Sequence, residues 1–147
     1  MKLKEQVLHA GLQHQQDSIK RLKETIKELQ ESANAEKGAG DEADSMREQL
    51  LADVDMYSRQ LDQATAAYAT LKLIDPNQVN STVKHGALVM TDKTNLLVGV
   101  SIGKVIVEGK TVFTISTDSP LYQAMEGKKK GETFSFRDQS QKVIDVI

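Results

Sequence analysis

The sequence contains no cysteine and no tryptophan, and it has few prolines, histidines and aromatic residues. The absence of cysteine excludes disulfide scaffolds, cysteine-ligated zinc sites and cysteine nucleophiles. The three histidines, His9, His14 and His85, show no spacing typical of metal ligands such as H-E-x-x-H. An aromatic content of 4% suits a core of valine, isoleucine and leucine, and it does not suggest base-stacking platforms.

Long hydrophobic runs and an excess of one charge are also missing. The N-terminal stretch MKLKEQVLHAGLQHQ lacks the apolar core of a signal peptide, and no apolar run approaches the ~18 residues of a transmembrane helix. We therefore expect a cytoplasmic protein without a membrane partner. The formal net charge of −2 gives no global reason for nucleic-acid binding, because nucleic-acid-binding proteins usually carry a basic excess.

The composition changes near Pro76. Residues 1–75 contain no proline and are rich in glutamate, glutamine, lysine, leucine and alanine, which all favour helices. From residue 77 onward valine, isoleucine, threonine and phenylalanine become more frequent, and glycines recur at intervals typical of turns. The sequence of 147 residues therefore predicts an α+β protein with a helical domain over 1–75 and a sheet domain over 77–147.

The helical half carries two apolar series whose members alternate at steps of four and three. The first series is Leu8, Leu12, Gln15, Ile19, Leu22, Ile26, Leu29 and Ala33, and the second is Met46, Leu50, Val54, Tyr57, Leu61, Ala64, Tyr68 and Leu71. A repeat of seven residues sustained in this way is typical of a coiled coil. The glycine-containing segment 34–40 between the two series permits a tight turn. These features predict an antiparallel coiled-coil hairpin, in which the polar Gln15 fixes the register.

The second half predicts a small, twisted antiparallel sheet with one short helix. The expected strands are Ala87–Thr91, Leu96–Ile102, Val105–Val107, Val112–Ser116, Thr133–Phe136 and Lys142–Ile147. A helix over residues 118–125 interrupts them, because Ser119 is a good N-cap and Pro120 suits the first helical position.

Acidic residues gather at the predicted turn of the hairpin, where five of them fall within residues 36–48. Asp41 and Asp44 are three positions apart, so on a helix they share a face with ~5–6 Å between their Cβ atoms. Two carboxylates at this spacing can share a divalent cation such as Mg²⁺. The alternative is that Asp41 caps the helix and the other acids interact with its dipole.

One long run resembles a known family. The segment from Ile115 to Phe134, ISTDSPLYQAMEGKKKGETF, is similar to the I-S-x-x-S-P-hydrophobic-x-x-A-hydrophobic-x-G-K-x-x-G-[DE] run of the bacterial Gre transcript-cleavage factors, the GreA/GreB family. The strand that begins at Gly86 with G-A-L-V-M resembles the family's G-x-x-V strand. The resemblance implies an N-terminal antiparallel coiled coil followed by an FKBP-like domain that docks on bacterial RNA polymerase.

The function that the resemblance implies is transcription elongation. Such factors insert the coiled coil through the secondary channel of RNA polymerase and stimulate its own cleavage of backtracked nascent RNA, so the factor itself is not an enzyme. Gly40-Asp-Glu-Ala-Asp-Ser45 resembles the family's G-D-L-x-E-N tip, and this gives Asp41 and Asp44 the catalytic roles, with Glu42 as a third candidate. Asp41 and Asp44 would hold Mg²⁺ jointly with the polymerase, and the isolated protein, expected to be a monomer, would bind no metal.

Two departures from the family keep other functions open. Asp44 is one methylene shorter than the family's glutamate, and Ser45 replaces the usual asparagine. A second register is available, because Ser32-Ala-Asn-Ala-Glu36 resembles the family's S-E-N-A-E and places alanine at the catalytic position. A non-catalytic regulator or inhibitor that occupies the secondary channel, and a coiled-coil scaffold protein, are therefore the alternatives.

Further contact residues follow from the same resemblance. It implies that Asp118, Ser119 and Pro120 dock on the polymerase, although helix capping alone also explains them. Four basic residues of the first helix would contact the RNA 3′ end: Lys20, Arg21, Lys23 and Lys27. The alternative for these four is a solvated face paired with glutamates at i,i+4 spacing. The run Lys128-Lys-Lys130 could contact nucleic acid or an acidic polymerase surface, or form a solvated turn.

Overall fold

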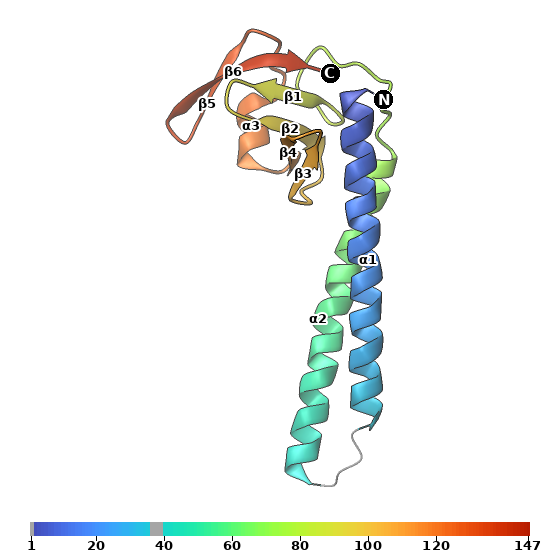
Figure 1. The fold of residues 1–147 in the computed structure, drawn as a ribbon. Helices are drawn as coiled ribbons and strands as arrows, with labels where there is room; N and C mark the ends of the chain where they lie inside the picture. Colours follow the sequence, from blue (N-terminus) through green and yellow to red (C-terminus); the bar gives the residue numbers. More distant parts are fainter. Residues whose placement is uncertain (1, 36–39) are drawn as a thin grey trace. The chain divides into compact units, whose positions relative to one another are not determined.

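Two long antiparallel helices precede a six-stranded sheet in this computed structural model, which describes residues 2–35 and 40–147 (Figure 1). The helices are α1 (Leu3–Ala35) and α2 (Asp41–Lys72). The elements that follow are β1 (Leu88–Thr91), β2 (Asn95–Gly99), β3 (Lys104–Val107), β4 (Lys110–Ser116), α3 (Pro120–Met125), β5 (Thr133–Phe136) and β6 (Gln139–Val146). The predicted α+β class, with a helical hairpin followed by a sheet and one short helix, is confirmed. None of the described helices combines the length and apolar character needed to cross a bilayer.

Packing divides the chain into two compact units. The globular unit combines Met1–Gln13 with Ala67–Ile147, and the hairpin unit is His14–Ala66. The globular unit therefore includes the first turns of α1 and the last turns of α2. This division does not test whether residues 77–147 form a domain separate from 1–75, so the predicted boundary stays a prediction.

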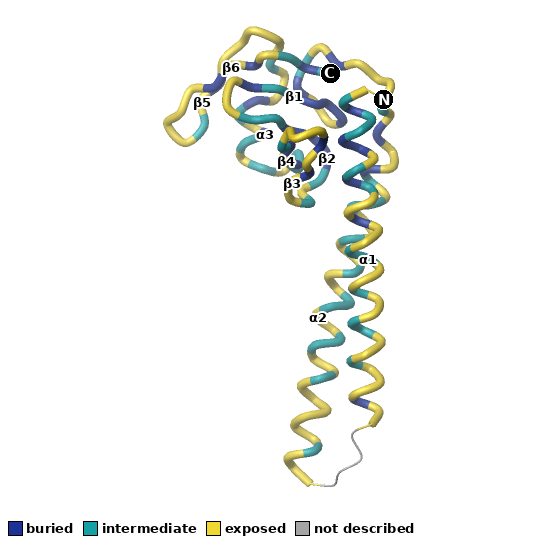
Figure 2. The backbone as a smooth tube through the Cα atoms, viewed as in Figure 1, coloured by how far each residue is buried: buried dark blue, intermediate teal, exposed yellow. Residues whose placement is uncertain are grey.

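The hairpin unit is held by the predicted heptad seam. With the exception of Met46, its seam positions are buried or half-buried along both helices, and they recur as teal and dark blue segments in Figure 2. Gln15 is 6% exposed, and its Nε2 donates a hydrogen bond to the carbonyl oxygen of Ala64 at 3.1 Å. A polar bond inside an apolar seam fixes the register of the two helices, as predicted.

Met46 is the one seam prediction in the hairpin unit that is wrong. Its side chain is 55% exposed, although the heptad repeat places it inside the seam. Counting heptads from the contact between Gln15 and Ala64 places Met46 opposite Ala33. The methyl group of alanine offers little apolar surface, so burial of the methionine there gains little free energy.

The sheet is mixed, and the expectation of a wholly antiparallel sheet is corrected. The strand order is β3-β4-β2-β1-β6-β5, and β2 pairs with β4 in parallel while the other pairs are antiparallel. The parallel register runs from Asn95 opposite Val112 to Gly99 opposite Ser116. It arises because β3 forms an antiparallel hairpin with β4, which returns the chain to β2 in the original direction.

Both faces of the sheet carry an apolar cluster. The cluster on the α3 side consists of Val83, Ala87, Val89, Leu96, Val98, Tyr122, Met125, Phe134, Val143 and Val146. The cluster on the other face consists of Val7, Leu8, Leu71, Ile74, Leu88, Leu97, Val105, Val107 and Val112. Neighbouring strand residues such as Leu96 and Leu97 point to opposite faces, so the central strands β1 and β2 contribute to both clusters. Helix α1 approaches closely at Gly11, where an added Cβ would lie 3.4 Å from Cδ1 of Ile102.

A buried lysine near the N-terminus binds the C-terminal residue and the segment that follows α2. Lys4 is 1% exposed, and its Nζ donates hydrogen bonds to the carbonyl oxygens of Gln78 at 2.8 Å and Ile147 at 3.5 Å. Nδ2 of Asn80 donates to the same Ile147 oxygen at 3.3 Å. Burial disfavours the ammonium form and lowers the pKa of Lys4, an effect that the Asp75 carboxylate opposes. The first turn of α1 is thereby tied to the segment that follows α2.

We expect Lys4→Met to lower the free energy of unfolding by about 1–3 kcal/mol, because it leaves the carbonyl of Gln78 without its donor. The pKa of Lys4 is lower in the folded than in the unfolded protein, so the unfolded state binds more protons between the two values. Stability from this group therefore rises with pH through that alkaline window, and the variant loses the rise. Urea unfolding followed by circular dichroism between about pH 8 and pH 10.5 measures both effects.

Lys2→Met, at an exposed position of the same segment, is the matched control and should stay within about 0.5 kcal/mol of the wild type. A Lys4→Met protein as stable as the control would contradict the anchoring role.

Candidate functional site

The acidic residues predicted at the hairpin turn begin α2. Asp41 is its first residue, Glu42 and Asp44 follow within the first turn, and all three are exposed. The amide of Asp44 donates the first intrahelical hydrogen bond, to the carbonyl oxygen of Gly40 at 3.2 Å. Gly40, whose φ is 111°, therefore holds the capping position, and the interpretation of Asp41 as the N-cap is wrong. The three carboxylates remain available for other contacts, while their charge favours the helix N-terminus.

Arg47 forms an ion pair that the sequence analysis missed. Its Nη2 lies 3.5 Å from Oδ1 of Asp44, and the two side chains are 46% and 64% exposed. The spacing of i,i+3 is the signal that could have revealed the pair. The same helix face carries Glu48 and Leu51, which line a depression of about 160 Å³ with Asp44 and Arg47. An exposed pair of this kind contributes about 0–1 kcal/mol, so another charged group can displace it.

Proteins commonly bind Mg²⁺ through one or two carboxylates, and water and phosphate supply the other ligands. Asp41 and Asp44 are two such carboxylates. Within residues 2–35 and 40–147, no three histidine or acidic side chains are grouped so that they could hold a metal ion by themselves. Glu36, which belongs to the second register of the tip, lies outside the described residues, as do residues 37–39 of the predicted acidic turn.

The basic residues predicted to contact RNA lie exposed on α1 within the hairpin unit: Lys20, Arg21, Lys23 and Lys27. Nη2 of Arg21 donates to Oγ of Ser18 at 3.3 Å. Arg21 also borders a groove of about 370 Å³ between the two helices, together with Ser18, Leu22, Thr25 and Gln60. These residues share the hairpin unit with the acidic first turn of α2.

The helix start at residues 118–120 is confirmed as a capped helix. Oγ of Ser119 accepts a hydrogen bond from the amide of Tyr122 at 3.2 Å and donates one to the carbonyl oxygen of Ser116 at 2.8 Å. Pro120 is the first residue of α3, and Asp118 and Pro120 are exposed. The cap engages the hydroxyl of Ser119, which is half-buried, whereas Asp118 and Pro120 beside it are exposed.

An apolar groove of about 550 Å³ lies beside α3 in the globular unit. Its lining is Thr94, Leu96, Ser101, Gly103, Lys104, Phe113, Thr114, Ile115 and Leu121. Phe113 is 46% exposed, and Ile106 on the neighbouring strand is 62% exposed. Oγ1 of Thr114 donates to the carbonyl oxygen of Gly103 at 2.7 Å and so holds the loop at the rim of the groove. An exposed apolar concavity of this kind marks a site for a protein or ligand.

The sequence analysis missed this groove, although alternation along β4 places Phe113 and Ile115 on one face of the strand. The missing information was the position of β3 at the sheet edge, next to β4.

Comparison with known proteins gives no family assignment. No family model matches the chain, and no curated protein matches it. A solved structure of the transcription factor Gfh1 is 16% identical over 93% of each chain, with a TM-score of 0.34. A structure of GreA factor homolog 1 (Gfh1) from Thermus thermophilus is also 16% identical, over 94% of this chain and 95% of that one, with a TM-score of 0.34. At this TM-score the likeness carries no argument about fold or function.

The cap at Ser119 generates a prediction. Ser119→Ala should lower the free energy of unfolding by about 1 kcal/mol, because the amide of Tyr122 loses its acceptor. Asp118→Ala changes an exposed neighbour and should stay within about 0.5 kcal/mol of the wild type. Urea unfolding measures the two values, and equal losses in the two variants would contradict the assigned cap.

Proposed function

We propose that this protein is a Gre-like transcription elongation factor that binds bacterial RNA polymerase by entering its secondary channel with the hairpin. It stimulates the polymerase to cleave backtracked nascent RNA and acts in the cytoplasm as a monomer. The observation that carries the proposal is the exposed acidic first turn of α2, Asp41, Glu42 and Asp44, at the turn of a two-helix hairpin. The family-like run over residues 115–134 is the supporting sequence feature.

The surface around α3 supports docking on a protein. The family-like run folds as the end of β4, the helix α3 and the turn into β5, and it places Asp118 and Pro120 beside the apolar groove. Protein interfaces combine an apolar centre with a polar rim. Phe113 and Leu121 supply the apolar centre here, and Asp118 and Lys104 supply charges near it. The globular unit therefore anchors the factor, with Asp118, Ser119 and Pro120 as the docking residues.

In the proposed complex the hairpin brings carboxylates to the polymerase active centre. Asp41 and Asp44 would hold a magnesium ion jointly with polymerase residues, and Glu42 adds negative charge nearby. Magnesium bound there would lower the pKa of a coordinated water and stabilise charge at the scissile phosphate. The basic residues Lys20, Arg21, Lys23 and Lys27 would hold the RNA 3′ end through its phosphates.

One observation favours a second function, that of a non-catalytic regulator in the same channel. The guanidinium of Arg47 pairs with the Asp44 carboxylate at 3.5 Å and so competes with a metal ion for it. A hairpin whose second acid is already neutralised could occupy the channel without supporting cleavage. The two functions share polymerase binding and differ only in the chemistry of this turn.

We expect the wild-type protein to shorten the RNA of a halted, backtracked transcription complex in the presence of Mg²⁺. Asp41→Asn/Asp44→Asn should slow this shortening by about 100-fold, because the metal loses correctly placed ligands, while retention on the polymerase is unchanged. Asp53→Asn/Asp55→Asn removes the same charge from the same helix and should cleave like the wild type. Gel analysis of the labelled RNA and co-purification with polymerase provide the two measurements.

Each outcome of that experiment selects one function. Equal shortening by the two double variants contradicts the catalytic assignment of Asp41 and Asp44. Binding without shortening by the wild type supports the non-catalytic regulator. If the protein neither binds nor shortens RNA and associates with itself, the proposal fails and the coiled-coil scaffold is correct.

Arg47 provides an independent prediction. Arg47→Gln should accelerate RNA shortening by up to about fivefold, because it frees Asp44 from an ion pair that contributes at most about 1 kcal/mol. Arg59→Gln breaks the comparable exposed pair with Asp55 on the same helix and should leave the rate unchanged. A slower reaction with Arg47→Gln would show that the arginine assists the chemistry.

A further inference from the structure

Two segments that are far apart in the sequence, residues 82–83 and 127–129, lie side by side in the globular unit. The amide of Val83 donates to the carbonyl oxygen of Lys128 at 2.9 Å, and the amide of Gly127 donates to the carbonyl oxygen of Val83 at 2.9 Å. Thr82 and Lys129 form an isolated antiparallel bridge. These contacts fix the two backbones side by side ahead of the sheet strands that follow them.

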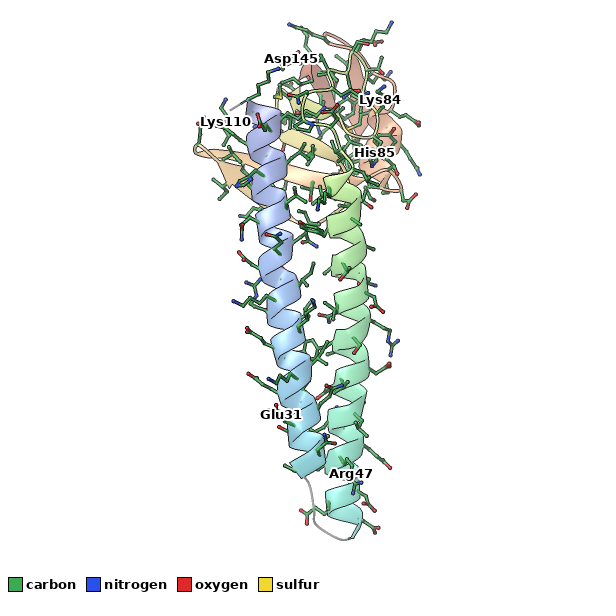
Figure 3. The ribbon with its side chains drawn as sticks, turned by 90° about the vertical axis from the view of Figure 1, so that its right-hand side faces the viewer. Glu31, Arg47, Lys84, His85, Lys110 and Asp145 are labelled. Carbon is green, nitrogen blue, oxygen red and sulfur yellow. The ribbon has the colours of Figure 1, made fainter. Side chains whose placement is uncertain are left out.

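These backbone contacts bring together two groups of basic residues that are far apart in the sequence. The basic surface consists of Lys84, His85, Lys128, Lys129 and Lys130. All of them are exposed except Lys128, which is half-buried. Figure 3 shows the labelled Lys84 and His85 close together, away from Lys110.

The local charge balance is opposite to that of the whole chain. Two acidic residues flank the lysine run, Glu126 and Glu132. Oε1 of Glu132 already accepts a hydrogen bond from the backbone amide of Lys129 at 2.8 Å, which engages this carboxylate in the turn. Asp75 adds a third acidic residue, since it acts on the charge of Lys4 together with Lys84. The four lysines still leave a small local positive excess, whereas the full chain has a formal net charge of −2.

The chemistry of the basic surface favours phosphate over a protein partner. The centres of protein interfaces are rich in tyrosine, tryptophan, phenylalanine and arginine and poor in lysine, and none of residues 84, 85 and 128–130 is one of these four enriched types. Lysine ammonium groups act as point charges that bind phosphate without a demand for bidentate geometry. A cluster of exposed lysines in an otherwise acidic protein is therefore suited to a polyanionic backbone.

We propose that the basic surface binds the phosphate backbone of nucleic acid without regard to sequence. This contact lies in the globular unit and does not depend on the cleavage function proposed for the hairpin unit. Binding of this kind releases counterions from the nucleic acid, so it is weak at physiological salt and strengthens steeply as salt is lowered. If the protein also binds a transcription complex, this surface would add a second contact, with the nucleic acid of that complex.

The test measures the full chain against two labelled probes by fluorescence anisotropy: a duplex DNA of about 20 base pairs and a single-stranded RNA of about 20 nucleotides. Salt is varied between about 50 and 200 mM. We expect a logarithmic salt slope of about −3 on duplex DNA, which corresponds to about three phosphate contacts. Lys84→Gln/Lys129→Gln/Lys130→Gln should weaken binding at the lowest salt by at least about 10-fold and bring the slope towards zero.

The matched control is Lys2→Gln/Lys93→Gln/Lys110→Gln, which removes the same charge from exposed lysines elsewhere in the globular unit. It should keep the affinity within about twofold and retain the salt slope, since only a local surface is involved. Comparable circular dichroism spectra for the two triple variants show that both are folded. Preference for one probe over the other identifies DNA or RNA as the source of the phosphates.

Three results would overturn the proposal. Equal losses in the two triple variants would mean that net charge, and not this surface, governs binding. Absence of wild-type binding at the lowest salt would remove the surface as a nucleic-acid site. Tighter binding to a labelled polyglutamate peptide than to either probe would assign the surface to an acidic protein.

Discussion

The buried ammonium of Lys4 and the apolar side chains around it hold the ends of the two long helices against one face of the sheet. Lys4 donates to the carbonyl oxygens of Gln78 and Ile147, while Leu8 and Leu71 fill the apolar cluster on that face. Both long helices are continuous from this base into the hairpin unit.

The two candidate sites use different physical means of meeting a partner. The first turn of α2 presents carboxylates on a helix N-terminus, where charge and exposure favour a cation or a basic group. The groove beside α3 presents the apolar side chains of Phe113, Ile115 and Leu121, where burial favours a complementary protein surface. The groove therefore offers apolar surface for burial, and the acidic turn offers exposed negative charge.

Local features were predictable from the sequence, whereas features that join distant segments were not. The heptads predicted α1 and α2, and capping rules predicted α3, because periodicity and caps depend on neighbours within a few residues. The parallel pairing of β2 with β4, the burial of Lys4 and the bridge between Thr82 and Lys129 all depend on tertiary contacts. At the acidic turn the sequence placed Asp41 and Asp44 near the start of the second helix, but the Gly40 cap and the ion pair of Arg47 with Asp44 emerged only from the geometry.

The hydrogen bond from Gln15 to Ala64 has a consequence for how far the hairpin can reach. Because this polar bond lies in an apolar seam, sliding one helix against the other by a heptad would bury an unpaired amide. Removing one heptad from each helix between this bond and Asp41 would preserve the seam and shorten the hairpin by about 10 Å. The length of the hairpin and the acidity of its turn can therefore change separately, because they depend on different residues of the same two helices.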